Sequence, residues 1–242
     1  MLADDEVERV LVVTAHPDDV DFGAAGSVAR WTEAGAEVEY CVVTDGDAGG
    51  FDPDVPRSDI PGIRQGEQRA AAEAIGVDEV HFLGYPDGRL EVSLDLRRDI
   101  SRVIRLVRPR RVLVQAPVRT LDSMYRNHPD HIAAGEAACC AVYPDARNPF
   151  TFPDLLSEGH EAWSVDELWI MGSGPEADTF VDITDTFDRK MKALRCHVSQ
   201  MTDADGIEER LRQWGAANAV AGGLEDGRLA EAFRVMDTRR RV

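Results

Sequence analysis

Apolar segments of strand length alternate with helical segments along most of this chain. Four segments are nearly all apolar and predict strands, at residues 10–15, 37–44, 79–85 and 111–117. Helical periodicity lies between them, at residues 26–35, 65–75 and 94–107. Apolar strands that are separated by helices indicate a parallel sheet covered on both faces. The pattern therefore predicts an α/β, Rossmann-like three-layer fold with a mostly parallel sheet.

The second half of the sequence is less regular. Here we expect a helix over residues 132–142, strands near 167–172 and 179–184, and helices over 188–201 and 207–219. No internal repeat, low-complexity tract or linker divides the 242-residue sequence. Because α/β folds of roughly 250 residues often form one unit, we predict one domain that spans residues 1–242.

The balance of charge argues against several partners. The chain carries 27 Lys and Arg against 45 Asp and Glu, a formal net charge of −18. Nucleic acids and anionic bilayers bind through Lys and Arg, so neither is expected as a partner. The first residues lack the pattern of a secretion signal, and no apolar run approaches the roughly 20 residues of a membrane helix. We expect a cytoplasmic protein, either a monomer or a homo-oligomer.

A dense group of ionisable residues follows the first predicted strand. The sequence AHPDDVDFGAAG places His16, Asp18, Asp19 and Asp21 within six positions. Ligands of open α/β sheets bind outside the carboxyl ends of the strands. An imidazole and a carboxylate three residues apart can reach one cation there and leave a neighbouring carboxylate free as a base. The alternative is that Asp18 or Asp19 only caps the following helix.

A second cluster repeats this chemistry in the middle of the chain. The sequence RNHPDHIAAGEAA places His128, Asp130 and His131 at the start of the helix expected over residues 132–142. Two histidines and one aspartate supply three protein ligands and leave one position of a zinc ion open for water, as in hydrolytic sites. We therefore predict a metal hydrolase, with zinc as the cofactor and iron(II) as the alternative.

The two motifs resemble those of the PIG-L, or LmbE-like, family of zinc-dependent N-acetylglucosaminyl deacetylases. AHPDD and HPDH carry the resemblance, and TDGDAGG, RQGEQRAAAEAIGV, GYPDG and HVSQ extend it along most of the chain. The resemblance implies a zinc-binding triad and three catalytic residues. The implied ligands are His16, Asp19 and His131, the implied general base is Asp18, and the implied acid or electrostatic pair is His128 with Asp130.

The resemblance also implies three substrate-binding residues, and each has a plainer alternative. Arg64 would hold the substrate, or else form a solvated ion pair with Glu67 one helical turn away. Asp87 would accept a sugar hydroxyl, or else serve the turn in GYPDG. His197 would line the pocket, or else be a core or surface residue of the helix over 188–201.

We predict a hydrolase that removes an N-acetyl or other N-acyl group from a small N-acetylglucosaminyl-type compound. Asp18 would activate water, and a protonated His128, which Asp130 orients and keeps cationic, would stabilise the oxyanion. One alternative is an amidase that acts on a larger acyl group or a thiol conjugate of a glucosaminyl compound. Another is a non-catalytic, metal-dependent sugar-binding protein.

Three further sequence features receive no role. Some family members have an aromatic residue two positions before HPDH, whereas here Tyr125 lies one position further away. The Asp-x-Asp of VVTDGDAGG lacks the lysine and acidic pair of an aspartyl-phosphate phosphatase. GSGPEA lacks the third glycine of a dinucleotide-binding loop.

Overall fold

The sheet of this protein is mostly parallel. The computed structural model describes residues 1–121, 124, 127–172 and 174–239. Within these residues seven strands form one sheet in the order β3-β2-β1-β4-β5-β7-β6. The first five in that order pair in parallel, and β7 runs antiparallel to both β5 and β6. The strands are β1 (Arg9–Thr14), β2 (Glu37–Thr44), β3 (Glu79–Tyr85), β4 (Arg111–Gln115), β5 (Glu167–Met171), β6 (Thr179–Asp182) and β7 (Ala230–Asp237).

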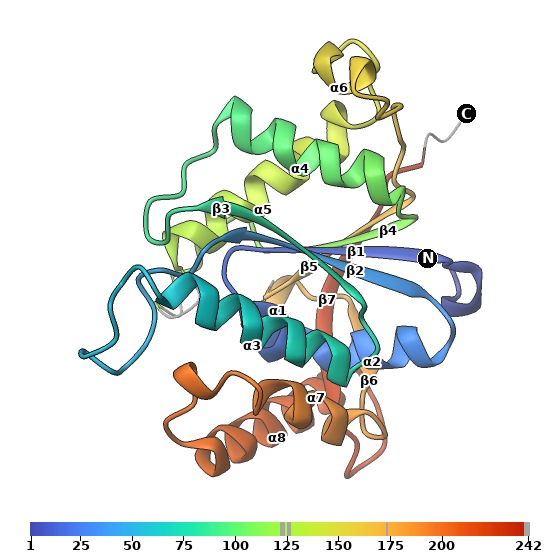
Figure 1. Ribbon diagram of the computed structural model, residues 1–242. Coiled ribbons are helices and arrows are strands. Elements are labelled where there is room, and N and C mark those ends of the chain that lie inside the picture. Colours follow the sequence, from blue (N-terminus) through green and yellow to red (C-terminus); the bar gives the residue numbers. More distant parts are fainter. Residues whose placement is uncertain (122–123, 125–126, 173, 240–242) are drawn as a thin grey trace.

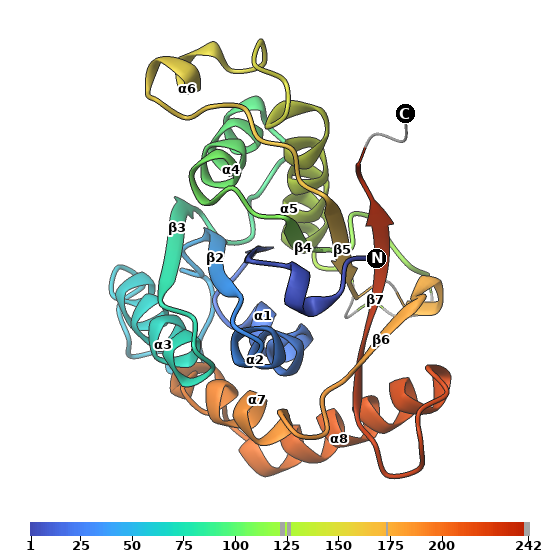
Figure 2. The same cartoon turned by 90° about the vertical axis from the view of Figure 1, so that its right-hand side faces the viewer.

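Helices cover both faces of this sheet, which confirms the predicted α/β fold (Figure 1). One face carries α4 (Leu94–Val107) and α5 (Pro129–Cys140), with α6 (Pro153–Ser157) beyond them. Figure 2 shows the opposite layer, with α7 and α8 on its outer side. The helices of that layer are α1 (Asp19–Gly23), α2 (Ala25–Glu33), α3 (Ile60–Ala74), α7 (Phe187–Leu194) and α8 (Ala204–Ala221). Short helical turns complete the described chain: η1 (Asp4–Glu6), η3 (Ala141–Asp145), η4 (Gly174–Glu176) and η5 (Val198–Gln200).

Alternate side chains of β1 enter two separate hydrophobic cores. Val10 and Val12 pack in the core that contains Trp31 of α2. Leu11 and Val13 pack in the core that contains Ile100 of α4. Because successive side chains of a strand point to opposite faces, an all-apolar strand belongs in the middle of a three-layer fold. The carboxyl end of β1 is therefore held from both sides.

Several predicted elements agree with the structure and others differ. The bounds of β2, β3 and α4 are those expected from the sequence. However, α5 begins at Pro129 rather than near residue 132, so the HPDH histidines lie at its cap and in its first turn. The helix expected over 188–201 is wrong in its second half, because α7 ends at Leu194. Strand β7 has no counterpart among the predicted elements.

The apolarity of the helices and the state of the cysteines do not bear directly on chemistry. None of the helices in the described ranges combines the length and apolarity that crossing a membrane requires. All four cysteines are free. The features that do bear on chemistry are the loops that follow β1, β2, β3 and β4, since the carboxyl ends of parallel strands meet at one edge of the sheet.

Candidate active site

The loop after β1 turns sharply at its catalytic candidates. Pro17 follows His16, and Asp18 adopts a left-handed conformation with φ of 94°. Left-handed backbone is costly for a residue with a side chain, although Asp tolerates it better than most. The turn is held by the backbone N–H of His16, which donates to Asp19 Oδ2 at 2.7 Å. As a result, Asp18 and Asp19 leave the turn in different directions and contact different partners.

The second histidine motif is placed by the start of α5. His128 is the N-cap residue, Pro129 occupies the first helical position that suits proline, and Asp130 and His131 follow in the first turn. A Cβ atom added at Gly135 would lie 2.3 Å from the backbone oxygen of Gln115, so α5 packs directly against the end of β4. The side chain of Gln115 in turn accepts a hydrogen bond from Ala15 N at 2.8 Å. These contacts join the two motifs.

Asp19 lies between the two histidines that the sequence assigns to the metal. Its Oδ2 is 3.3 Å from His16 Nδ1, and its Oδ1 is 3.0 Å from His131 Nε2. Burial opposes ionisation of Asp19, but His131 and His16 lower its pKa well below the ordinary value. One carboxylate and two imidazoles thus converge on a small volume, and carboxylate oxygen and imidazole nitrogen are donors that zinc and iron(II) accept.

The other side of the His16 ring faces two more carboxylates. Its Nε2 lies 3.1 Å from Asp87 Oδ1 and 3.2 Å from Asp130 Oδ2. Burial alone would lower the pKa of His16, but Asp19, Asp130 and Asp87 together raise it to about 12. A carboxylate that holds one ring nitrogen of a histidine, leaving the other for a metal, is a common arrangement around protein-bound metals. The carboxylates around His16 therefore favour positive charge at this ring. A metal ion bound at Nδ1 would supply that charge in place of a proton.

Asp130 is engaged differently from the sequence expectation. Its carboxylate accepts hydrogen bonds from Gly88 N and Leu90 N and faces His16, whereas only its backbone N–H contacts the His128 ring, at Nδ1. Burial, together with His16 and His131, lowers the pKa of His128. Because Nδ1 accepts, the ring proton of a neutral His128 lies on Nε2. The carboxylate of Asp130 thus lies against His16, while the His128 ring contacts the backbone of Asp130, and the predicted acid or electrostatic role of the pair stays a prediction.

The three imidazoles nevertheless form one cluster. The ring centroid of His128 lies 4.7 Å from that of His16 and 5.0 Å from that of His131. Two groups in the described chain bring three possible ligand atoms within 4.8 Å of one another: His16 with His128 and His131, and His16 with Asp87 and Asp130. Geometry alone thus admits His128 as a ligand as well as a catalytic neighbour of the metal.

Asp18 contacts an arginine instead of the histidines. Arg64 Nη2 donates to Asp18 Oδ2 at 3.0 Å and to the backbone oxygen of Pro17. Burial and the charge of Asp19 raise the pKa of Asp18 to about 7, against the opposing effect of Arg64. The Asp18 side chain makes no capping hydrogen bond to α1, so the helix-cap interpretation does not hold for it. A largely buried carboxylate with a pKa near neutrality is suited to accept a proton.

Arg64 is not the solvated residue that the plainer interpretation requires. It is buried, with 4% of its surface exposed, and it contacts the loop after β1 and the loop after β2, where it donates to the Gly46 oxygen. Glu67 instead accepts hydrogen bonds from the backbone and hydroxyl of Ser199. Arg64 therefore links Asp18 to the neighbouring loop.

A buried network of hydrogen bonds links the backbone of Asp18 to Gln68, Asp21 and His197. Gln68 Oε1 accepts from Asp18 N at 2.7 Å, and Gln68 Nε2 donates to Asp21 Oδ2 at 2.9 Å. His197 Nε2 lies 2.8 Å from the same Asp21 oxygen, and both residues are fully buried. Burial opposes the charged form of His197, but Asp21 raises its pKa. The structure thus places His197, the residue before η5, against Asp21 of the loop after β1, and its predicted role in lining the substrate pocket stays a prediction.

Sequence reasoning missed Gln68, Gln115 and the role of Asp21. Gln68 had a local signal, because it follows Arg64 by four residues and shares its helix face. Gln115 lies near the end of the strand predicted over residues 111–117, where a polar side chain after an apolar run was the available sign, and it ends the observed β4. The partner of Asp21 lies 176 residues away, and no local pattern predicts such a pair. Tyr125, to which the sequence assigns no role, lies outside the described residues.

Comparisons with known proteins identify the family of this chain. Residues 11–142 match the family model PIG-L, described as GlcNAc-PI de-N-acetylase. The chain is 32% identical to the diacetylchitobiose deacetylase of Thermococcus kodakarensis over 198 residues, which cover 82% of this chain and 72% of that protein. It is 30% identical to the 1D-myo-inositol 2-acetamido-2-deoxy-alpha-D-glucopyranoside deacetylase of Rhodococcus erythropolis, in an alignment that covers 81% of this chain and 82% of that protein.

A solved structure shows the same relation. The N,N'-diacetylchitobiose deacetylase of Pyrococcus horikoshii, complexed with its inhibitor MPG, superposes with a TM-score of 0.87 at 29% identity. The superposition covers 96% of this chain and 85% of that one. The matched region of the family model contains His16, Asp19 and His131, and the likeness of sequence and fold extends beyond it. This chain therefore belongs to the PIG-L, or LmbE-like, family.

Proposed function

We propose that this protein is a metal-dependent hydrolase that removes the N-acetyl group from a small N-acetylglucosaminyl-type compound. One observation carries the proposal: two adjacent aspartates have separate partners. Asp19 lies between His16 and His131, and Asp18 lies against Arg64. This division provides a donor for a metal and a free base beside it. The relatives, whose names describe deacetylases of amino sugars, support the same reaction class.

The donor set of the proposed centre is His16 Nδ1, the Asp19 carboxylate and His131 Nε2. We assign zinc to it, with iron(II) as the alternative, since both accept two imidazoles and one carboxylate. Such an ion supplies Lewis acidity and lowers the pKa of a water molecule from about 15.7 toward roughly 7. Asp87 and Asp130 hold the opposite nitrogen of His16 and thereby fix the direction of the ring.

Amide hydrolysis needs a base, a hydrogen-bond donor for the developing oxyanion, and an acid for the amine. Asp18 takes the proton of the attacking water at a carboxylate oxygen, and Arg64 keeps that carboxylate in place. His128 would donate from Nε2–H to the oxyanion, because its Nδ1 already accepts a hydrogen bond from Asp130 N. Asp18 or His128 then returns a proton to the leaving amine, so that amide and water become amine and acetate.

Two alternatives to a deacetylase differ from it in the acyl group that is removed or in the absence of catalysis. An amidase for a larger acyl group or a thiol conjugate of a glucosaminyl compound would use the same groups. A non-catalytic sugar-binding protein would not need a base beside the metal, and the separate placement of Asp18 favours catalysis. Substrate-binding roles for Arg64, Asp87 and His197 remain proposals. The first two side chains border Asp18 or His16, and His197 contacts Asp21.

Acetate release is the direct test. The purified protein is offered a panel of N-acetylglucosaminyl compounds after treatment with a chelator, with and without added zinc or iron(II). We expect acetate from at least one compound, only when metal is restored. N-butanoyl analogues on the same sugars distinguish the larger-acyl amidase. Binding of metal and sugar without any acyl release from either series would contradict the proposal.

A further inference from the structure

The peptide group that joins Pro17 to Asp18 is bound at both ends by helix α3. Arg64 Nη2 donates to the Pro17 oxygen at 2.6 Å, and Gln68 Oε1 accepts from Asp18 N at 2.7 Å. The two side chains lie four residues apart and therefore share one face of the helix. The orientation of this peptide plane is thus fixed by contacts to two buried side chains.

This peptide group needs such support, because Asp18 has a left-handed backbone with φ of 94°. Residues with a side chain avoid this conformation unless the surrounding structure holds them in it. A rotation of the peptide plane would change φ of Asp18 and, with it, the direction in which the carboxylate leaves the chain. The contacts to Arg64 and Gln68 therefore also determine where the Asp18 carboxylate lies.

The side-chain amide of Gln68 has one possible orientation. The backbone N–H of Asp18 is a donor, so it requires the amide oxygen. The amide nitrogen then faces Asp21, and it donates to Oδ2 at 2.9 Å. Nε2 of His197 lies 2.8 Å from the same carboxylate oxygen. The Asp21 carboxylate, in contact with His197, thus keeps the oxygen of Gln68 directed at Asp18.

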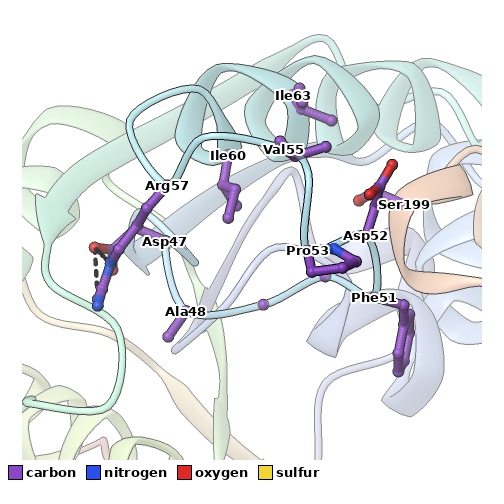
Figure 3. A pocket seen from close by; sticks show the side chains of 12 residues that line it. Asp47, Ala48, Phe51, Asp52, Pro53, Val55, Arg57, Ile60, Ile63 and Ser199 are labelled. Atoms are coloured by element: carbon purple, nitrogen blue, oxygen red, sulfur yellow. Dashed lines mark hydrogen bonds and ion pairs between the residues drawn. The ribbon is translucent and has the colours of Figure 1, made fainter.

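His197 is itself held close to α3 by the short turn η5 that follows it. Ser199 of η5 lies at the wall of a pocket of about 390 Å³, which the loop after β2 forms with the start of α3 (Figure 3). The backbone N–H and the hydroxyl of Ser199 both donate to Glu67, the residue before Gln68, at 2.7 Å each. The network that starts at Gln68 therefore returns to α3 at Glu67.

We propose that Gln68 is a positioning residue of the hydrolysis, which holds Asp18 in its left-handed turn so that the carboxylate meets the attacking water. The inference rests on the proposed function, in which Asp18 is the base. Within the described residues the hydrogen bonds of Gln68 go to Asp18 and Asp21 and not to the metal donors, so it acts through Asp18. Asp19 is held separately, by the backbone N–H of His16.

The first test is Gln68→Met in the metal-loaded enzyme, which keeps the length of the side chain and removes both hydrogen bonds. We expect kcat to fall about a hundredfold, the order for a catalytic group displaced by about 1 Å, with KM and metal content at native levels. Hydrogen exchange of the Asp18 amide, followed by NMR, should become faster because its acceptor is lost.

Thr32→Val is the control for a merely structural effect. Thr32 of α2 donates to the backbone oxygen of Ile75, just beyond the carboxyl end of α3, at 2.7 Å. Its loss removes a hydrogen bond to the same helix at a distance from Asp18. This variant should be less stable than the native protein but keep its kcat and its Asp18 exchange rate.

A reversal of the hydrogen bonds provides the second test. Gln68→Glu sets two carboxylates against each other and should lower kcat as Gln68→Met does. In Gln68→Glu/Asp21→Asn, the new amide nitrogen at position 21 can donate to the glutamate and to Nε2 of His197. His197 can then carry its proton on Nδ1, which has no partner within the described residues. The double variant should recover most of the lost kcat.

The outcomes separate this inference from the proposed function. Native kcat in metal-replete Gln68→Met, or a double variant no more active than Gln68→Glu, would overturn the positioning role. Loss of metal together with kcat in Gln68→Met would also overturn it, since the residue would then support the whole centre. Unchanged exchange of the Asp18 amide in Gln68→Met would overturn it even without an activity assay. No acetate from the native enzyme would instead count against the proposed function.

Discussion

The loops that follow β1 and β2 begin side by side at the same edge of the sheet, yet they are held in different ways. In the first loop His16 is 7% exposed and Asp21 is fully buried. The side chains of Gln68 in α3 and Gln115 in β4 accept hydrogen bonds from backbone N–H groups of this loop. In the second loop Phe51 is 66% exposed, and an ion pair between Asp47 and the exposed Arg57 spans the turn. Three of the residues assigned to chemistry, His16, Asp18 and Asp19, lie in the first loop, and the second loop carries none of the assigned residues.

This difference follows from the function assigned to each loop. Catalytic groups must be held within a fraction of an ångström, so they need buried partners that lock their rotamers. A loop that carries no catalytic group can vary in sequence and exposure without loss of the reaction. If this division is correct, changes in the first loop and its supports should have large effects, and changes in the second should have small ones.

The largest expected effect is that of Asp18→Asn. Because the amide cannot take a proton from water, turnover should fall roughly a hundredfold to ten-thousandfold, the range for a lost general base. Asp18 contacts Arg64 rather than His16 or His131, so metal content should stay at the native level. Steady-state kinetics and metal analysis on the same samples check this. Loss of metal in the variant would mean that Asp18 and Asp19 have exchanged roles.

His128→Ala is expected to have the next largest effect. If His128 donates to the oxyanion, turnover should fall about a hundredfold, as for one lost oxyanion donor, while the metal and the fold remain. If His128 is a fourth ligand, as its ring distances to His16 and His131 would allow, metal affinity and stability should fall together. Metal titration and thermal unfolding of the variant distinguish these two cases, and native turnover in a metal-replete variant would refute both.

His197→Ala tests the buried support of the first loop. Removing one member of a fully buried pair leaves the Asp21 carboxylate with only Gln68 as its partner. The free energy of unfolding should fall by about 3 kcal/mol, the lower part of the range for such a loss. Denaturant unfolding measures it. Unchanged stability would show that Asp21 does not depend on His197.

Arg57→Ala makes the matched change in the second loop and has the smallest expected effect. Arg57 is more than half exposed and pairs with the less exposed Asp47. Exposed ion pairs stabilise proteins by less than about 1 kcal/mol, so the free energy of unfolding should change by no more than that. A loss as large as that of His197→Ala, measured under the same conditions, would remove the contrast between the two loops.

The sequence was sufficient to predict the parts that depend on short-range pattern. The apolar runs of β1 and β2 and the periodicity of α4 predicted the central sheet and one of its covering layers. Since parallel strands end at one edge, the same runs predicted that the AHPDD and HPDH motifs would meet. The structure brings their side chains together, with Asp19 Oδ1 3.0 Å from His131 Nε2 and His16 Nε2 3.2 Å from Asp130 Oδ2.

Long-range contacts account for what the sequence did not predict. Residues 195–197 leave the helical path expected for them, and His197 pairs with Asp21 176 residues away, a tertiary contact that overrides local helical preference. The carboxylate of Asp130 reaches His16, 114 residues away, instead of the His128 ring two positions before it. Strand β7 likewise depends on its pairing with β5 and β6. None of these partners can be found from spacing.

The most direct test of the account is the metal content of His131→Ala measured beside that of the native protein. His131 comes from the motif that begins α5, and Asp19 from the loop after β1, so the variant tests whether the two motifs build one centre. We predict about one metal ion per native chain and a folded variant that binds the ion far more weakly and releases no acetate. Full metal occupancy in folded His131→Ala would contradict the proposed centre.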